Sequence, residues 1–414
     1  MGCPEPSAVS LFGISSRKGA LRLVRLIMFA AAALMASPSV QAQTYTVLHS
    51  FAGGADGKLP EAGVVMDRSG NVYGTATYGG ITGGNCGIEG CGTVFKLTHH
   101  SAGWTLTPLY SFAGSDHNDG ALPSAPVALG LDGALYGTTS EGGLGYGTVF
   151  RLSPPATFCR SVSCPWTETV LYRFRGGSDG GYPAYGGLVF DRAGNLYGTT
   201  SGVSQDGEND KDATVFELTP SGGGWVQTVL HNFGVGGGVY AGVIFDSAGN
   251  LYGTWSNANA VYELTPTGSS WQYQPIFMFN GADGNFPTGG LAFDSTGNLY
   301  GTTISNGGTV YELQPSGGSW TLTTLYNFNA YEGPLTGPTL DAAGNVYGTV
   351  PFVEGSGIVY KMTHTGGGWQ ETNLTNFDFV EPIGSVILDA SGNIYGTESS
   401  GGSDGRGTVF EITP

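Results

Sequence analysis

The sequence predicts an all-β protein, a seven-bladed β-propeller in which every blade is a four-stranded sheet. Three observations support this prediction. A short signature recurs seven times, each copy contains four strand-like segments, and a strand missing from the last copy stands at the other end of the chain. Repeats of this size are typical of propellers and related arrays.

The signature is Tyr-Gly-Thr. In the copy at 187–200, the apolar segment Gly-Leu-Val-Phe is followed by Asp-Arg-Ala-Gly-Asn and then by Leu-Tyr-Gly-Thr-Thr. A later Thr-Val-Phe-Glu-Leu segment and a Trp-to-Phe segment complete the copy. Short runs of Val, Phe, Tyr and Thr between Gly and Asp clusters predict strands. The seven signatures begin at Tyr73, Tyr136, Tyr197, Tyr252, Tyr300, Tyr347 and Tyr395.

The Asp-x-x-Gly-Asn segment predicts a tight hairpin with a bulge between the first two strands. Asp191 is expected to accept backbone hydrogen bonds, while Gly194 and Asn195 are expected to adopt positive φ. The aspartates of this turn are therefore interpreted as structural.

The fourth strands predict how the ring closes. A Trp is followed eight positions later by a Phe in six copies, whereas the seventh copy ends after its third strand, at 407–414. The segment 45–51 ends at Phe51, which fits the Phe position, and the Trp position falls on Gln43. An open sheet edge promotes aggregation, so we expect this N-terminal strand to complete the last blade. The alternative, an open solenoid, would require polar caps at both ends.

Residues 1–42 have the pattern of a signal peptide. Arg17, Lys18, Arg22 and Arg25 precede an apolar run at 26–36 and a small-residue cleavage site at 40–42. No later run reaches the roughly 20 apolar residues of a membrane-spanning helix. The sequence therefore predicts a single propeller domain at 43–414, exported to the periplasm or the medium, with no membrane span after cleavage.

The net charge of the chain excludes two classes of partner. The chain has a net charge of −17, and loss of residues 1–42 would leave about −20. Nucleic acids and anionic membranes attract basic surfaces, so neither is expected as a partner. The charge does not identify a partner, because acidic residues also serve solubility. A glycan or an extracellular protein stays open as the partner, and the protein is expected to be a monomer. Hydrophobic residues make up 40% of the chain, which is enough to form a core.

The cysteines predict two disulfides. Four residues separate the members of each pair, Cys86 with Cys91 and Cys159 with Cys164, and both pairs lie inside extended loops. In an exported protein the oxidising compartment favours a disulfide in each pair. Zinc would require further ligands nearby. The Asp-Gly motifs at 54–57, 177–180 and 281–284 are the alternative sites for calcium. Each offers one carboxylate, whereas a calcium loop supplies several oxygen ligands, so these motifs are interpreted as turns. No metal and no cofactor are predicted.

One face of the propeller is expected to carry the binding site. The loops between second and third strands are long in copies seven, one, two and three and short in copy four, which would form a groove, although drift in tolerant loops would give the same pattern. Aromatic residues expected on this face are Tyr78, Tyr146, Tyr182, Tyr185, Trp255, Phe286, Tyr331, Phe352 and Phe379. Packing between blades is the alternative role for each of them. The residues assigned to binding are Tyr146, Tyr182, Tyr185, Trp255, Phe286, Tyr331, Asp179 and Asp283.

The segments 188–200 and 214–220 resemble the GloVer tandem repeats of exported bacterial proteins, over nearly the whole chain after residue 42. They resemble NHL propeller repeats more weakly, because Gly-Thr replaces the Val-Ala-Asp that usually follows Leu-Tyr. This resemblance implies export and a propeller fold, and it implies no activity.

The function favoured by these observations is a binding module that recognises a glycan or a protein through its loop-rich face. A carbohydrate-active hydrolase or lyase with paired carboxylates is the alternative, with Asp116, Asp119, Asp179 and Asp283 as its acids. A structural role at the cell surface without a ligand is also open. Only His117 among the histidines lies in a candidate loop, so histidine-based catalysis is not predicted.

Overall fold

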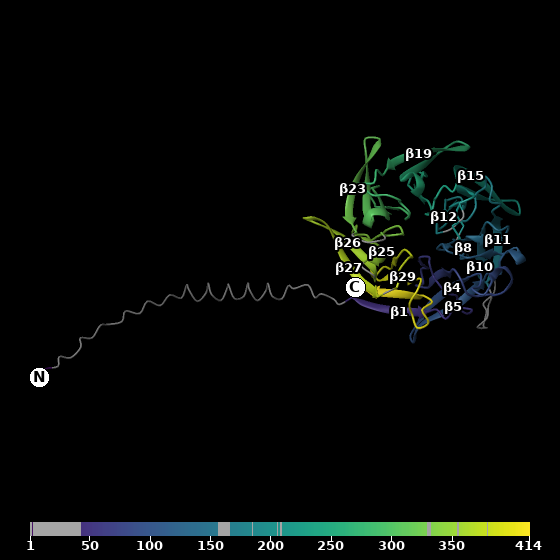
Figure 1. The fold of residues 1–414 in the computed structure, drawn as a ribbon, viewed down its shortest axis with the longest axis horizontal. Coiled ribbons are helices and arrows are strands. Elements are labelled where there is room, and N and C mark those ends of the chain that lie inside the picture. The colour runs from purple at the N-terminus through teal and green to yellow at the C-terminus, as the bar shows by residue number, and fades with distance from the viewer. Residues whose placement is uncertain are drawn as a thin grey trace. The chain divides into compact units, whose positions relative to one another are not determined.

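The structure is a computed structural model that describes residues 43–155, 166–183, 185–204, 206–207, 209–328, 333–353, 356–378 and 380–414, together with Gly2. Seven four-stranded antiparallel sheets stand in a ring around a common centre (Figure 1). The predicted seven-bladed β-propeller is therefore confirmed. No helix within the described residues has the length and apolar character needed to cross a membrane. The proposed signal peptide lies outside the described part, apart from Gly2.

Each blade begins with a two-residue strand near the centre of the ring and ends with a longer strand at the rim (Figure 1). Blade 1 contains β2 (Val65–Met66), β3 (Val72–Ala76), β4 (Thr93–His100) and β5 (Gly103–Ser111). Blade 2 contains β7 (Ala128–Leu129), β8 (Leu135–Thr139), β10 (Thr148–Ser153) and β11 (Thr167–Arg173), beside the short pair β6 (Gly120–Ala121) and β9 (Glu141–Gly142). Blade 3 contains β12 (Val189–Phe190), β13 (Leu196–Thr200), β14 (Asp212–Ser221) and β15 (Gly224–Val235).

The remaining blades repeat this order. Blade 4 contains β16 (Ile244–Phe245), β17 (Leu251–Trp255), β18 (Ala260–Thr267) and β19 (Ser270–Met278). Blade 5 contains β20 (Ala292–Phe293), β21 (Leu299–Thr303), β22 (Thr309–Ser316) and β23 (Ser319–Asn327). Blade 6 contains β24 (Thr339–Leu340), β25 (Val346–Val353), β26 (Ser356–Thr365) and β27 (Gly368–Asp378). Blade 7 contains β28 (Ile387–Leu388), β29 (Ile394–Glu398), β30 (Thr408–Thr413) and β1 (Thr44–Ser50), and short 3-10 helices lie in loops at η1 (Gly84–Cys86), η2 (Ser115–His117), η3 (Ser256–Ala258) and η4 (Ser305–Gly307).

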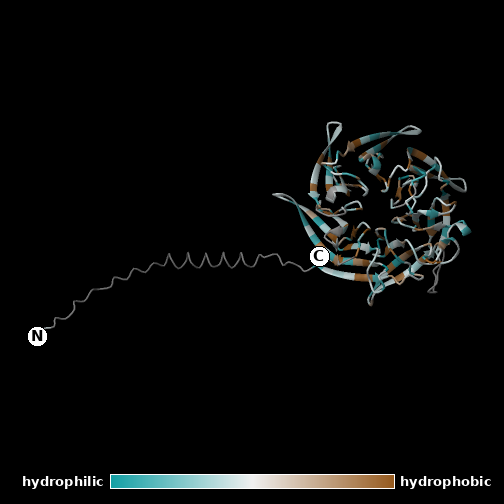
Figure 2. Ribbon diagram, viewed as in Figure 1, coloured by the Kyte–Doolittle hydropathy of each residue, from teal (hydrophilic) through white to brown (hydrophobic). Residues whose placement is uncertain are grey.

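The core lies between neighbouring blades, so both faces of a blade are buried. In β14, Val215 and Phe216 are both fully buried although successive strand residues point to opposite faces. Val215 packs with Val243 of blade 4, whereas Phe216 packs with Phe174 of blade 2. Hydrophobic residues accordingly recur along the strands around the whole ring (Figure 2). A blade of this kind needs a neighbour on each side.

Each residue of the Tyr-Gly-Thr signature has a separate structural role. The Tyr197 hydroxyl lies 3.2 Å from Asp191 Oδ2 in the preceding turn and 2.8 Å from Glu217 Oε1 on β14. A Cβ atom on Gly198 would lie 2.7 Å from the Phe216 ring, so only glycine fits beneath that ring. Thr199 Oγ1 donates a hydrogen bond of 2.9 Å to a backbone carbonyl of blade 4.

The threonine bond recurs around the ring. Six of the seven signature threonines donate, over 2.8 to 3.1 Å, to the carbonyl oxygen of a residue that leads into the first strand of the next blade. The pairs are Thr75 with Ala125, Thr199 with Ala241, Thr254 with Gly289, Thr302 with Thr336, Thr349 with Gly384, and Thr397 with Ala62. The last pair spans the junction between blades 7 and 1. The signature is therefore a device that joins blades.

The Asp-x-x-Gly-Asn turn differs from the prediction at one residue. Asp191 accepts hydrogen bonds from the backbone N–H groups of Ala193 at 2.8 Å and Asn195 at 2.9 Å, and Gly194 has a φ of 89°, as expected. The expectation of positive φ at Asn195 was wrong. Its side chain instead donates from Nδ2 to Asp191 Oδ2 at 2.8 Å, so it locks the turn by a side-chain bond.

The N-terminal strand closes the ring as predicted. β1 pairs antiparallel with β30, from Thr44 opposite Thr413 to Ser50 opposite Thr408, with a bulge between Val47 and His49. Phe51 is fully buried, and its ring centroid lies 5.2 Å from that of Phe95 in blade 1. The last blade is therefore built from both ends of the described domain.

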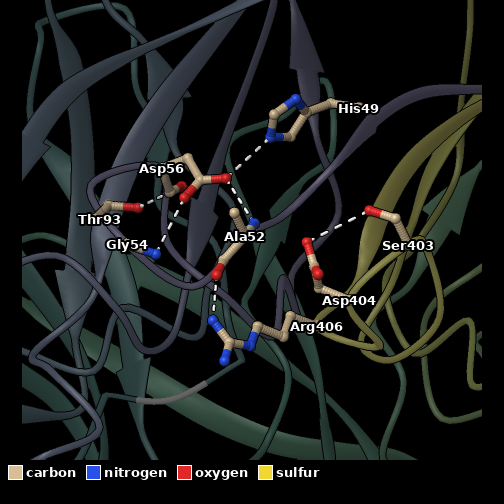
Figure 3. A network of polar contacts seen from close by, with 8 residues as sticks. All are labelled: His49, Ala52, Gly54, Asp56, Thr93, Ser403, Asp404 and Arg406. Atoms are coloured by element: carbon tan, nitrogen blue, oxygen red, sulfur yellow. Dashed lines mark hydrogen bonds and ion pairs between the residues drawn. The ribbon is translucent and has the colours of Figure 1, made fainter.

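A polar network fixes the turn that follows β1 (Figure 3). Asp56 accepts hydrogen bonds from the backbone N–H groups of Ala52 at 2.8 Å and Gly54 at 3.2 Å, and His49 Nε2 lies 3.2 Å from its Oδ2. Arg406, from the loop between β29 and β30, donates to the Ala52 carbonyl. This network ties blade 7 to the segment that enters blade 1.

The Cys86–Cys91 disulfide is present, which confirms that pairing. Its loop docks on the neighbouring loop of blade 2, where Asn85 N donates to Asp116 Oδ2 at 3.0 Å and Asn85 Nδ2 donates to Ser115 Oγ at 2.6 Å. Cys159 and Cys164 lie outside the described residues.

Deleting residues 43–51 is expected to abolish the cooperatively folded monomer, because blade 7 would lose its fourth strand and expose β30. Size-exclusion chromatography and thermal unfolding would detect the change. Val47→Ser is the control, since this β1 side chain is exposed and the strand stays in place. A monomeric deletion variant with the melting temperature of the parent protein would contradict the role of β1.

Replacing Tyr311 by Phe is expected to raise the free energy of unfolding by about 1 kcal/mol. The hydroxyls of Tyr262, Tyr311 and Tyr360 are buried and have no hydrogen-bond partner among the described residues. Phe95, Phe150, Phe216 and Phe410 stand opposite the signature glycine in the other four blades, so phenylalanine fits this environment. Urea unfolding would measure the difference, and Phe216→Tyr should lower stability. A loss of stability in Tyr311→Phe would mean that the hydroxyl is bonded.

Candidate functional site

A cavity of about 600 Å³ opens at the centre of the ring. Its wall is formed by all seven blades, each through the segment that leads into its first strand. Glu61, which precedes β2, accepts a hydrogen bond of 3.0 Å from the hydroxyl of Thr77, which directly follows β3. The mouth of the cavity therefore lies on the face where the loops between second and third strands begin.

One position per blade lines this mouth, two residues before the residue that starts the Gly-Leu-Val-Phe-like segment. We call these the mouth residues. They differ from blade to blade, whereas a proline precedes five of the seven and alanine, glycine or threonine follows each of them. They comprise one carboxylate, two tyrosines, two hydroxyl residues and two aliphatic residues. The mouth residues are Glu61, Ser124, Tyr185, Tyr240, Thr288, Leu335 and Ile383.

Glu61 is the only charged residue among the described residues that line the cavity. Burial is the main cause that raises the pKa of its carboxyl above the usual value, and the negative charge of Glu381 in blade 7 acts in the same direction. The hydrogen bond from Thr77 opposes this shift. Only Thr77 donates to Glu61 among the described residues, through Oε2. Oε1 is thus left for a ligand.

Tyr185 stands at the mouth with a φ of 65° and 51% of its surface exposed. Although about half exposed, it is surrounded by enough protein to raise the pKa of its hydroxyl to about 12, and the charge of Glu61 contributes. Tyr78 and Tyr240 are the other neighbours that act on this hydroxyl. Tyr185, Tyr240 and Glu61 line the same cavity.

A one-residue insertion explains the unusual position of Tyr185. In blades 1, 2 and 5 a positive-φ residue stands four positions before the start of the first-strand segment, as Leu59 does before Gly63. In blade 3 the corresponding residue, Tyr182, stands five positions before Gly187. The extra residue places a bulky side chain in left-handed backbone conformation at the mouth, which is uncommon for such a residue.

Two hydroxyls in the cavity wall have no hydrogen-bond partner among the described residues. Ser124 is 1% exposed and its Oγ is unpaired, and Thr288 Oγ1 is buried and unpaired as well. A buried polar group without a partner is costly, so such groups normally meet water or a ligand. Because both oxygens are buried, the surface that the wall presents to the cavity is largely apolar, with glycine, valine and leucine beside the carboxylate of Glu61.

The aromatic residues assigned to binding from the sequence are placed differently from one another. Tyr185 lines the cavity, and Phe286 is 40% exposed outside it. Tyr182 is buried, with its ring centroid 5.9 Å from that of Tyr146. Trp255 packs on Phe233 at 4.8 Å and donates from Nε1 to the carbonyl of Gly237. The side chains of Tyr331, Phe352 and Phe379 lie outside the part that the structure describes.

The aspartates of the candidate loops hold turns and do not line the cavity. Asp179 accepts hydrogen bonds from the Tyr172 hydroxyl at 2.9 Å and from the backbone N–H of Arg175 at 3.0 Å. Asp283 accepts from the backbone N–H of Asn280 at 2.9 Å. Asp119 accepts from the Tyr110 hydroxyl and from Ala113 N, and Asp116 from Asn85 N. Across the described residues, no three His, Cys, Asp or Glu side chains gather closely enough to hold a metal ion.

Sequence reasoning missed Glu61, Ser124, Tyr240 and Thr288. Their signal was positional, because they occupy one aligned site that varies between copies more than its neighbours do. Tyr185 was identified as an aromatic residue of the loop-rich face, without its place in this set.

Solved structures share this fold at low sequence identity. Virginiamycin B lyase from Staphylococcus aureus matches with a TM-score of 0.57 and 14% identity, over 90% of this chain and 99% of that chain. A putative 6-phosphogluconolactonase from Bacteroides uniformis ATCC 8492 matches with a TM-score of 0.52 and 15% identity, over 77% and 86% of the two chains. The extracellular domain of a putative hybrid two-component system from B. thetaiotaomicron matches with a TM-score of 0.52 and 12% identity, over 90% and 41%. These similarities show the propeller fold alone.

No curated protein matches the sequence. The model of the Gloeobacter/Verrucomicrobia repeat matches residues 35–202 and 256–414, which is well over half of the chain. The match confirms the resemblance drawn from the Tyr-Gly-Thr copies. The chain therefore belongs to the Gloeobacter/Verrucomicrobia (GloVer) repeat family.

Proposed function

We propose that this propeller is an exported binding module that takes a glycan into the central cavity through its loop-rich face. The observation that carries the proposal is the open cavity, whose wall offers the carboxylate of Glu61 and the half-exposed ring of Tyr185. A sugar would use both features, because it has hydroxyl groups around its edge and apolar C–H faces that pack on aromatic rings.

The size of the cavity favours a small ligand. Pockets that bind small molecules usually measure about 300–1,000 Å³, and this cavity of about 600 Å³ lies within that range. A protein partner would instead need about 800 Å² of surface on each side. A protein could use this cavity only by inserting a short segment into its mouth.

The arrangement favours binding over hydrolysis. Glycosidases use two carboxyl groups, either about 5–5.5 Å or about 6.5–9.5 Å apart, on opposite sides of the scissile bond. Glu61 alone supplies a carboxylate to the described cavity wall, while Asp116, Asp119, Asp179 and Asp283 accept hydrogen bonds within loops and turns.

One observation supports hydrolysis as a second candidate. Burial and the nearby Glu381 raise the pKa of Glu61, and a raised pKa suits a general acid. In that case Glu61 would protonate the leaving group, and Glu381 would be the second carboxylate. Mass spectrometry of a bound glycan after incubation would detect turnover, which Glu61→Gln should abolish. If the glycan is recovered intact, hydrolysis is contradicted and binding without turnover is the function that stands.

Tyr185→Ala is expected to weaken glycan binding at least about fivefold, because an aromatic contact contributes about 1 kcal/mol beyond the area that it buries. A glycan array followed by isothermal titration calorimetry would measure this change. Leu144→Ala serves as the control, since this exposed residue lies outside the cavity. Phe286→Ala separates two versions of the proposal. A loss there but not at Tyr185 would move the site from the cavity to the outer loops.

Export rests on the N-terminal pattern, on the family resemblance and on the Cys86–Cys91 disulfide, which suits an oxidising compartment. N-terminal sequencing of the exported protein is expected to begin at Gln43. Thiol counting under denaturing, non-reducing conditions is expected to find no free thiol, because Cys159 and Cys164 would also be joined. Four free thiols in the exported form would contradict both disulfides and the oxidising compartment.

A further inference from the structure

We infer that the ligand of the central cavity carries a positive charge, and that the preferred glycans are sugars with a free amino group. This inference rests on the proposed glycan-binding function and specifies its ligand. It is carried by the position of one carboxylate in an otherwise uncharged cavity, beside two tyrosines.

Charge in the cavity is negative without a local counterion. Glu61 is the only charged residue of the described cavity wall, and its Oε1 receives no hydrogen bond from the described residues. Two lysines of the loop-rich face, Lys58 and Lys211, are already paired with Glu89 and Asp210, respectively. A ligand with an ammonium group would therefore supply the positive charge that the cavity lacks.

The tyrosines beside Glu61 also favour a cation. Tyr185 and Tyr240 line the same cavity as Glu61. An ammonium group that pairs with Glu61 would share the cavity with these rings, whose faces attract cations. The same chain already places Lys211 Nζ 4.9 Å from the ring centroid of Tyr146.

Further carboxylates around the cavity would attract a cationic ligand from a distance. Glu381 acts on Glu61 from blade 7, while Glu141 and Asp206 act on Tyr78 from blades 2 and 3. The whole chain has a net charge of −17. A negative field of this kind raises the local concentration of a cationic ligand, and salt screens it.

An uncharged sugar would use the cavity less fully. The ring of Tyr185 serves a neutral sugar and an amino sugar equally well. The carboxylate of Glu61 distinguishes them, because burial of a carboxylate under a neutral ligand costs free energy that an ammonium group would offset.

The decisive comparison uses two oligosaccharides with the same backbone, the fully deacetylated chitosan trimer and the N-acetylated chitin trimer, with the purified protein in isothermal titration calorimetry. The chitosan trimer is expected to bind at least about tenfold more tightly, as for one charge-assisted contact. Glu61→Gln should remove this advantage, so that the two trimers bind the variant with similar affinity. Glu141→Gln is the matched control, because it removes the same charge near the mouth but outside the cavity wall.

The pH dependence provides a second readout. Burial is the main cause that raises the pKa of Glu61, the charge of Glu381 acts in the same direction, and the hydrogen bond from the Thr77 hydroxyl lowers it. The pKa values of the neighbouring Tyr78 and Tyr185 hydroxyls are raised as well. A raised pKa means that Glu61 becomes charged at a higher pH than an ordinary carboxyl. Affinity for the chitosan trimer should therefore rise with pH as Glu61 ionises, at a pH above the usual range of a carboxyl and while the amino groups of the trimer stay protonated, and this rise should vanish in Glu61→Gln.

The outcomes separate this inference from the proposed function. Equal affinity for the two trimers, or a preference for the chitin trimer, would overturn the positive charge and keep the cavity as a glycan site. An equal loss in Glu61→Gln and Glu141→Gln would overturn the direct contact with Glu61. Binding of neither trimer would overturn the inference, and the glycan array would then decide whether the proposed function survives.

Discussion

The architecture depends on the burial of both faces of every blade. Val215 and Phe216 are consecutive and fully buried, and each packs against a different neighbouring blade. A sheet with two hydrophobic faces is stable only between two others, so the series cannot stop without exposing a face. Pairing of β1 with β30 answers this constraint, and the bond from Thr397 to Ala62 repeats at that junction the contact that joins blades elsewhere.

Most of the fold could be predicted from the sequence because the same physical contacts are repeated. The tyrosine reaches the Asp of its turn, the glycine makes room for an aromatic ring, and the threonine joins the next blade, so these residues recur. Phe51 could be assigned to the last blade for the same reason, since it occupies a conserved place in the repeat frame of this chain. The error at Asn195 arose because a residue that tolerates positive φ also has an amide that can bond an aspartate, and composition does not distinguish the two uses.

The candidate site was harder to predict because it is built from residues that do not repeat. The seven mouth residues come together only when the ring closes, and nothing local marks Glu61 or Tyr240 as neighbours. Conversely, Asp179 and Asp283 attracted attention as acids in glycine-rich loops, and the structure shows that they hold those loops in shape. The acidic residues that stand out in short segments stabilise the fold. The cavity, in contrast, is formed by residues that are far apart in the sequence.

The threonine bonds have a consequence for how such a chain can change. Each one ends on a backbone carbonyl directly after a mouth residue, in the pairs with Ala62, Ala125, Ala241, Gly289, Thr336 and Gly384. A carbonyl is present whatever the side chain, so the joint between blades places no demand on the identity of the mouth residue. Mutation and selection can therefore exchange these side chains one blade at a time while the ring stays intact. The lining of the cavity can therefore change while the contacts that hold the ring together are kept.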